Sequence, residues 1–472
     1  MTIASEKENI QNPLGYKPVG KLLITFSIPA IISCLINSIY NIVDQIFIGQ
    51  GVGYLGNAAT TVAFPIMTII LAFGTLIGSG SSAYAAIRLG EKKLDEAEKT
   101  LNSAFLFSII TGIVLMVLGL IFLKPILTLF GATENIMPYA IDYTAIILLG
   151  TPFNLLSIVL SNLARTDGHP RLSMYGMMIG AGLNTILDPI YIFIFNWGVK
   201  GAAIATITSQ IISAIVLTAY FFKSSKNPQH MQIKKSHLKL KGKLIISFLT
   251  LGISSGITQS VACIMQVVMN NSLVYYGNQS PIGGDVALSA MGIVMKISMI
   301  MGAFGIGVGI GAQPILGYNR GALQYKRIKK TYIYAVIMAT ILILAGWIVC
   351  QTFPEFIIGI FGNENAEFTD FAVKCLRIFL FGIFCAGFQI VSTSYFQATG
   401  QPLKASILSM LRQLLLLIPL IIILPLFFGL RGILYSAPVA DISSALIVAC
   451  FMVPEMAKLE RHIKEEKTSV NI

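Results

Sequence analysis

Four polar side chains recur at helical spacing within an apolar stretch near the start of the chain. They stand at i, i+3, i+4 and i+7: Asn37, Tyr40, Asn41 and Asp44. A helix would carry all four on one face. Asp44 is the only charged residue from Leu22 to Ile48, and a carboxylate at the centre of a bilayer costs roughly 2.5–3.5 kcal/mol. Such a face cannot contact lipid, so the pattern predicts a path for an ion or a solute.

A second carboxylate, Asp188, stands in a similar setting. Asn184 precedes it by one helical turn on the same face, and Pro189 follows it. Proline has no N–H, so the carbonyl of Thr185 loses its helical partner and is free for a cation or water. Carboxylate, amide and carbonyl oxygens suit sodium or a proton. Because neither helix alone can satisfy a bound ion, we expect Asp188 to pair with Asp44. In the alternative interpretation, Asp188 only accepts structural hydrogen bonds near a helix end.

The elements that position these residues are membrane helices. The chain has 472 residues, of which 55% are hydrophobic and 11% charged, whereas soluble domains have about 25% charged residues. Apolar runs of about 20 residues, each enough for one crossing, recur along its length. The first follows some 20 polar residues without a cleavage site, so we interpret it as a retained helix. We predict twelve spans: 21–49, 55–88, 101–127, 138–164, 171–197, 199–223, 243–275, 287–317, 329–352, 367–397, 403–428 and 431–454.

The net charge of +12 is concentrated in alternate loops. The basic groups run from Arg88 to Lys99, at Arg165 and Arg171, from Lys223 to Lys243, from Arg320 to Lys330, and from Lys458 to Lys467. The other loops hold few basic residues. This positive-inside pattern predicts that both termini are cytoplasmic and argues against nucleic-acid binding.

The second half of the chain repeats the first at an offset of 231 residues. Gly74, Gly78 and Gly80 recur as Gly305, Gly309 and Gly311, and further glycines follow in the same register. The GxxxG spacing in each set predicts close helix packing rather than a hinge. Each copy holds six spans, so the halves are predicted to be parallel repeats around a central cavity. The predicted segments are 1–20 (cytoplasmic), 21–223 (first lobe), 224–242 (linker), 243–454 (second lobe) and 455–472 (cytoplasmic tail).

The two copies differ in their charges. At the repeat offset, Asp188 corresponds to Pro419, and the region matching Asp44 has no charge. We therefore expect cation handling in the first half. Asp441, the other acidic residue well inside a span, is expected to pair with Arg412. Lys296 adds a positive charge to the second half, where a basic cavity would suit an anionic substrate.

Cysteine and histidine carry little of the predicted chemistry. The six cysteines fall in or beside apolar spans without a CxxC pair, so we interpret them as buried hydrophobic residues. The four histidines lie in predicted cytoplasmic loops or the tail. This excludes a histidine proton relay inside the membrane.

In these segments the chain resembles the multidrug and toxic compound extrusion (MATE) family. SIPAIISCLINSIYNIVDQIFIG is similar to the family's first helix, and LNTILDPIYIFIFNWGVKGAAIAT to its fifth and sixth helices. ARTDGHPRLSM and FQATGQPLKASILSMLR look like its paired loop motifs. The resemblance implies two six-helix lobes that export organic cations against a proton or sodium gradient.

Carried over by position, the resemblance implies a cation site in the first lobe. Asp44, Asn184 and Asp188 match it, with a possible sodium ion among them, and Tyr143 and Thr206 join it in close relatives. The chain departs from the family at two positions. Ser161 stands where many relatives have asparagine, and Gln259 lies near a position where the sodium-driven branch has glutamate.

The predicted function is a multidrug efflux antiporter that exports amphipathic, mostly cationic drugs in exchange for protons or sodium. It would need no cofactor and would not be an enzyme. We expect a monomer in the lipid of a bacterial inner membrane. Aromatic residues and methionine let one pocket accept many shapes. The predicted substrate cavity comprises Asn37, Phe64, Phe153, Met178, Gln259, Met265, Met269 and Lys296, beside Tyr40 and Tyr143.

Three other functions fit the sequence less well. A lipid-linked oligosaccharide flippase of the same wider fold would need a strongly basic cavity, which two carboxylates oppose. An intramembrane aspartyl protease would need a GxGD-like signature, and the nearest string is IGGD at Asp285, in a predicted external loop. A passive channel would not explain the parallel halves.

Overall fold

The computed structural model describes residues 12–52, 54–130, 132, 134–223, 230–360 and 366–470. Within these residues, twelve helices are long and apolar enough to cross a membrane. The first half of the chain forms α1 (Pro13–Tyr16), α2 (Val19–Val52), α3 (Tyr54–Gly90), α4 (Leu94–Ile121), α5 (Leu123–Leu129), α6 (Met137–Thr166), α7 (Pro170–Pro189), the π-helical turn η1 (Ile190–Ile194) and α8 (Gly198–Phe222).

The second half repeats this order after a short linker. It forms the 3₁₀ turn η2 (Lys235–His237), α9 (Gly242–Asn278), α10 (Gly284–Gly321), α11 (Tyr325–Thr352), α12 (Pro354–Gly359), α13 (Ala366–Phe379), the 3₁₀ turn η3 (Ile383–Cys385), α14 (Ala386–Ala398), α15 (Pro402–Met410), the π-helical turn η4 (Leu411–Leu417), α16 (Ile418–Phe428) and α17 (Leu430–Val470).

All twelve predicted spans are present, but the third differs from its prediction. The apolar run suggests residues 101–127, whereas α4 starts at Leu94 and ends at Ile121. Hydropathy misses the polar first turns, which include Asp95 and Glu96. Pro125 has no N–H for the carbonyl of Ile121, so α4 stops and the short α5 begins.

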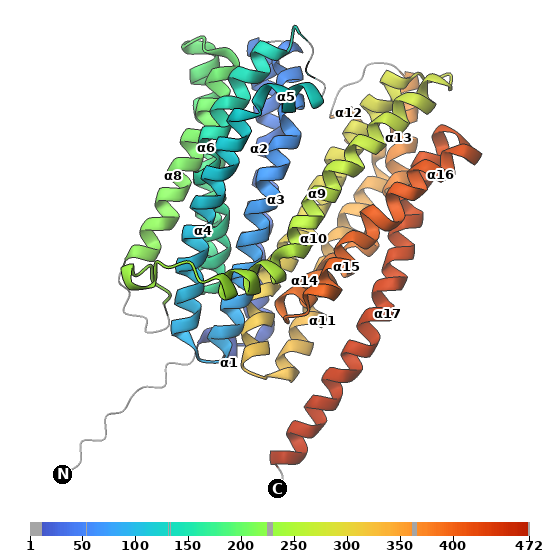
Figure 1. The fold of residues 1–472 in the computed structure, drawn as a ribbon. Helices are drawn as coiled ribbons and strands as arrows, with labels where there is room; N and C mark the ends of the chain where they lie inside the picture. The colour runs from blue at the N-terminus through green and yellow to red at the C-terminus, as the bar shows by residue number, and fades with distance from the viewer. Residues whose placement is uncertain are drawn as a thin grey trace, which may run out of the picture.

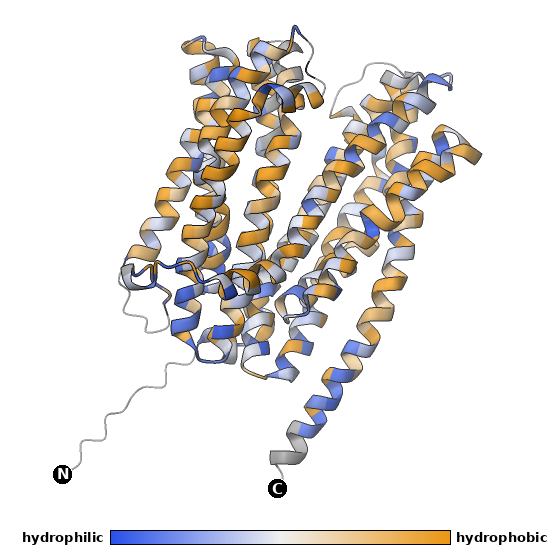
Figure 2. Ribbon diagram, viewed as in Figure 1, coloured by the Kyte–Doolittle hydropathy of each residue, from blue (hydrophilic) through white to orange (hydrophobic). Residues whose placement is uncertain are grey.

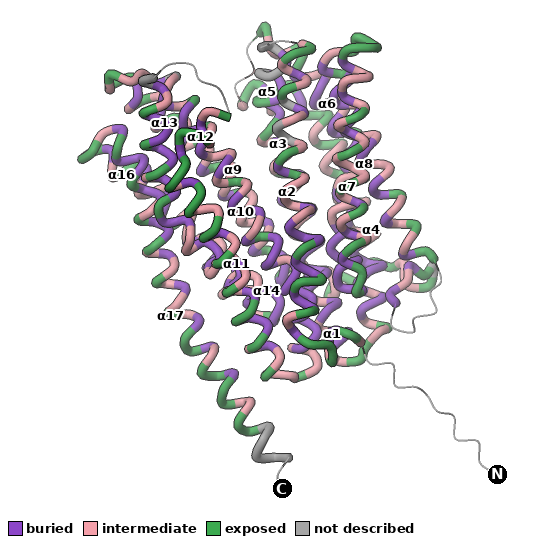
Figure 3. Tube along the Cα trace, turned by 180° about the vertical axis from the view of Figure 1, so that it is seen from behind, coloured by how far each residue is buried: buried purple, intermediate pink, exposed green. Residues whose placement is uncertain are grey.

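The helices form two bundles, α2–α8 (the N-lobe) and α9–α17 (the C-lobe), as Figure 1 shows. The short helix α1 and the C-terminal end of α17 lie at one end of the molecule, where hydrophilic residues also gather (Figure 2). We call this end, with the loops at Arg88–Lys99, Arg165–Arg171 and Arg320–Lys330, the basic end. The bundles meet near it and diverge toward α5 and α12 (Figure 3).

Glycines make the contact between the lobes very close. A Cβ on Gly252 of α9 would overlap the carbonyl of Leu76 on α3, and one on Gly80 would overlap the carbonyl of Phe248. On the other side of the interface, Gly311 of α10 lies directly against the backbone of Ser27 on α2. The two lobes therefore touch backbone to backbone near the basic end.

The GxxxG glycines pack inside each lobe, which confirms the packing prediction. A Cβ on Gly74 would lie 2.7 Å from Ile158 of α6, and one on Gly78 2.8 Å from Asn162. In the C-lobe, Gly305 and Gly309 face α14 in the same way. Because the hydrophobic effect does not drive helices together within a bilayer, close van der Waals packing at small residues holds them against each other.

The cysteines follow their prediction only in part. All six are free, and Cys350 and Cys375 are buried. Cys34, Cys263 and Cys385 are half-buried, and Cys450 is exposed on α17. The prediction of burial is wrong for Cys450, because an apolar helix in a membrane also turns one face to the lipid.

Candidate functional site

Two buried carboxyl groups meet inside the N-lobe. Asp188 on α7 is 0% exposed and Asp44 on α2 is 9% exposed. Their carboxyl groups lie within electrostatic range of each other. Two carboxyl groups can share a hydrogen bond only when one of them holds a proton. Asp44 and Asp188 are therefore neighbouring carboxyl groups inside an apolar bundle, a setting in which two such groups can hold one proton between them.

Neighbouring helices supply the polar surroundings of this pair. The Asn184 amide donates to Asp188 Oδ1 at 3.2 Å and to Thr206 Oγ1 on α8 at 3.1 Å. The Tyr40 hydroxyl approaches Thr206, and the buried Tyr143 of α6 lies within electrostatic range of both carboxyl groups. Side chains from α2, α6, α7 and α8 therefore converge on one site.

Three buried oxygens at this site have no hydrogen-bond donor among the residues that the structure describes. They are Asp44 Oδ1, Asp188 Oδ2 and Asn184 Oδ1. A buried acceptor left without a partner costs about 1–3 kcal/mol, so such groups indicate a ligand, an ion or a proton. Carboxylate and amide oxygens are suitable ligands for a hard monovalent cation, and the two carboxyl groups can also hold a proton. The site therefore fits either coupling ion.

Backbone irregularity accompanies Asp188. Pro189 removes the partner of the Thr185 carbonyl, and the chain continues as the π-helical turn η1. The corresponding span of the C-lobe also carries a π-helical turn, η4, which contains Arg412; at the repeat offset of 231 it matches residues 180–186, before η1. Single π turns in membrane helices are frequent at functional sites.

The structure does not confirm two other residues that the sequence assigns to the cation site. The side chain of Asn41 lies outside the described residues. Ser161 lies elsewhere, because its hydroxyl bonds to Ser173 at 2.6 Å near the basic end. It is 18 residues beyond Tyr143 on α6, or about 27 Å at 1.5 Å per residue. The expectation that Ser161 belongs to the cation site is therefore wrong.

The predicted cavity residues are spread over the structure. Met265 and Met269 are buried in the C-lobe core, so they serve in packing and their assignment to a cavity is wrong. Asn37, Phe64, Phe153 and Met178 are exposed, while Gln259 and Lys296 are half-buried. The assignment of these six to a substrate cavity remains a prediction.

One buried acidic residue of the C-lobe is paired with an arginine. Arg412 Nε on η4 donates to Asp441 Oδ1 on α17 at 2.5 Å. The Asp441 side chain is 2% exposed. This confirms the predicted pair, and it leaves the N-lobe carboxyl groups without an equivalent in the C-lobe.

A polar cluster at the basic end was not predicted. Asp167, which follows α6, is buried and bonds His230 Nδ1 at 2.6 Å and the Tyr220 hydroxyl at 2.5 Å, and it accepts from the Met231 amide at 2.8 Å. Burial alone would raise the pKa of Asp167, but its bonds to His169 and His230 hold that pKa below its usual value. The bond to Asp167 raises the pKa of His169. The only sign of this cluster in the sequence is the string DGH at residues 167–169, together with His230 in the linker.

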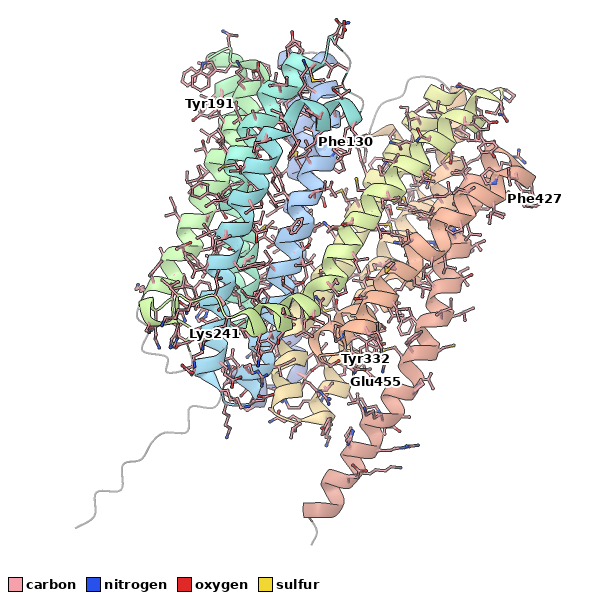
Figure 4. The ribbon with its side chains drawn as sticks, viewed as in Figure 1. Phe130, Tyr191, Lys241, Tyr332, Phe427 and Glu455 are labelled. Carbon is pink, nitrogen blue, oxygen red and sulfur yellow. The ribbon has the colours of Figure 1, made fainter. Side chains whose placement is uncertain are left out.

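This cluster attaches the linker to the N-lobe. Further along the linker, the Lys234 amide donates to Asn102 on α4 at 3.0 Å, and its ammonium bonds Glu98 at 2.6 Å. The linker then reaches Lys241, at the start of α9 (Figure 4). In the C-lobe, Glu455 of α17 accepts from Gln401 at 2.6 Å and pairs with Lys404 at 3.1 Å. Each lobe thus fixes its basic end around a buried carboxylate.

Comparison with known proteins gives a consistent result. The MatE family model matches residues 29–190 and 259–423. The multidrug export protein MepA of Staphylococcus aureus (strain MRSA252) is 29% identical over 430 residues, covering 91% of this chain and 92% of the relative. MepA of Staphylococcus haemolyticus (strain JCSC1435) is 28% identical over 447 residues, covering 92% and 93%.

Solved structures share the fold. A crystal structure of MATE in complex with MaL6 has a TM-score of 0.89 at 22% identity and covers 95% of this chain and 99% of its own. The outward-facing conformation of a MATE transporter of the MOP superfamily has a TM-score of 0.87 at 22% identity and covers 94% and 97%.

Proposed function

The chain belongs to the MatE family, and we propose that it exports amphipathic, mostly cationic compounds in exchange for protons. The observation that carries the proposal is the burial of two neighbouring carboxyl groups, Asp44 and Asp188, inside the N-lobe. The printed names of the MepA relatives, multidrug export proteins, support the same activity. The family is one of transporters, and we propose no enzymatic role for the chain.

The exchange follows from the charge of the pair. With the pair deprotonated, the N-lobe holds negative charge that attracts a cationic compound. When a proton binds, that attraction weakens and the compound leaves. An ion can shift a conformational equilibrium only through different affinities for the two states, and these carboxyl groups can provide that difference.

The arrangement of the lobes indicates a direction. They touch at the basic end and diverge at the opposite end (Figure 1). By the positive-inside rule we propose that the basic end faces the cytoplasm. A compound bound in this state would leave to the outside of a bacterial inner membrane.

Transport by the purified protein in proteoliposomes tests the proposal. Vesicles with an imposed proton gradient and no sodium should move an ethidium-like cation against the proton flow. Vesicles with only a sodium gradient should move none. Export driven by sodium after the proton gradient has been collapsed would show that the coupling ion is wrong. No transport under either gradient would reject the function.

A further inference from the structure

A buried arginine lies near the basic end of the N-lobe. Arg165, in the last turn of α6, is 7% exposed. Its guanidinium donates to Asn162 Oδ1 at 2.7 Å, to Ser161 Oγ at 3.5 Å and to the Ser173 hydroxyl. All these partners are neutral. Among the described residues no carboxylate lies within 4.0 Å of it, so a full positive charge remains uncompensated inside the bundle.

Arg165 lies between the helices that carry the carboxyl pair. It contacts Ser173 of α7, and Cys34 of α2 lies within its electrostatic range. Cys34 precedes Asp44 by ten residues, and Ser173 precedes Asp188 by fifteen. At 1.5 Å per residue, the guanidinium is about 15–22 Å from the carboxyl groups, toward the basic end.

Arg165 lies at the same depth along the helices as the contacts that close the space between the lobes. The hydroxyl of Thr166 bonds Ser82 of α3 at 2.7 Å. One turn away on α3, Ser79 accepts from Gln397 of the C-lobe at 3.0 Å, beside the Gly80 contact. Gln397 also donates to the carbonyl of Leu251 at 3.0 Å. The space between the lobes is thus sealed by backbone contact and a neutral amide.

Gln397 is the repeat counterpart of Arg165. Each stands three residues before a glycine of positive φ, Gly168 at 90° and Gly400 at 79°. The C-lobe residue reaches across to the N-lobe, whereas the N-lobe residue keeps its charge within its own bundle. The positive charge of Arg165 and the carboxyl groups of Asp44 and Asp188 are therefore in the same lobe, and the C-lobe counterpart of Arg165 is neutral.

We propose that Arg165 is an electrostatic barrier that stops cations, protons included, from passing between the carboxyl pair and the basic end. A fixed arginine charge in a narrow path repels cations, as it does in membrane channels that exclude them. The inference rests on the proposed exchange at Asp44 and Asp188. An exchanger that opens to one side at a time needs such a barrier, because an ion that crosses the N-lobe alone would dissipate the gradient.

Proton leak into proteoliposomes tests the barrier. Vesicles contain a pH-sensitive dye, a potassium diffusion potential drives protons inward, and no compound is present. Arg165→Gln should raise the leak roughly tenfold, which corresponds to lowering the barrier by about 1.4 kcal/mol. Ser173→Asp should raise it similarly, because the new carboxylate would neutralise the guanidinium in place. Arg165→Lys should stay at the wild-type leak.

Matched variants separate charge from structure. Arg171→Gln removes an exposed arginine at the same end of α7 and should not leak. A wild-type leak in folded Arg165→Gln would overturn the barrier, as would an equal leak in Arg165→Lys or Arg171→Gln. If Arg165→Gln does not fold, Ser173→Asp decides the question in the same way. Export by wild-type vesicles is measured alongside, so a leak in Arg165→Gln without wild-type export would reject the exchange and retain the barrier.

Discussion

Asp188→Asn is expected to reduce the export of ethidium-like cations at least roughly tenfold, while the protein remains folded and in the membrane. The side chain is fully buried, and one of its oxygens has no donor within the described part of the chain. Asparagine preserves its size but can neither bind a proton nor carry a charge. The variant loses the difference in affinity that drives the exchange. Efflux from cells expressing equal amounts of each protein measures the effect.

An acidic residue outside the site provides the control. Asp142 lies on α6 of the same lobe, with its side chain 43% exposed and paired with Lys200 at 3.2 Å. Asp142→Asn is the same chemical change and should retain wild-type efflux, because exposed ion pairs contribute little. Equal efflux in the two variants would remove Asp188 from the coupling site.

Gly252→Ala should shift the protein away from the state in which the basic end is closed. The added methyl group would overlap the Leu76 carbonyl, and the Gly80 Cα would lie only 3.1 Å away. Overpacking of this kind costs about 1–3 kcal/mol, which changes an equilibrium by about 5- to 150-fold. We expect slower export, since the closed state would form less often.

Distances between spin labels across the basic end measure this shift. Labels at Lys92 and Leu403, in a protein without its six native cysteines, report on the two lobes; both positions are exposed. Gly302→Ala is the matched control, because no atom lies within 4 Å of its added Cβ. Gly252→Ala should lengthen the distance and Gly302→Ala should not. Identical distributions would show that this contact does not set the equilibrium.

The sequence predicts the helices and the carboxyl pair because both depend on local patterns. Span length, the i to i+7 polar face and Pro189 are visible along the chain. The partnership of Asp44 with Asp188 followed from a physical argument, that one helix cannot satisfy an ion alone. The Arg412–Asp441 pair followed from another argument, that opposite charges within membrane spans pair with each other.

Other features depend on which helix faces which. Ser161 was assigned to the wrong site because its match to a family position did not show how far along α6 it lies. Met265 and Met269 were assigned to a cavity because a methionine suits a core as well as a cavity. The burial of Arg165 depends on α2, α3 and α7 packing around the end of α6. Nothing in the string ARTDGHP shows that none of the described carboxylates would pair with its arginine. The backbone contact at Gly252 likewise arises only once two lobes meet.

Proton release on binding of the compound tests the central claim most directly. In a weakly buffered solution of purified protein, an ethidium-like cation should displace the proton shared by Asp44 and Asp188, and the pH should fall in proportion to the bound compound. The Asp44→Asn, Asp188→Asn double variant should release none. Equal release from the double variant, or release that disappears only in Asp441→Asn, would contradict the account and move the exchange out of the N-lobe.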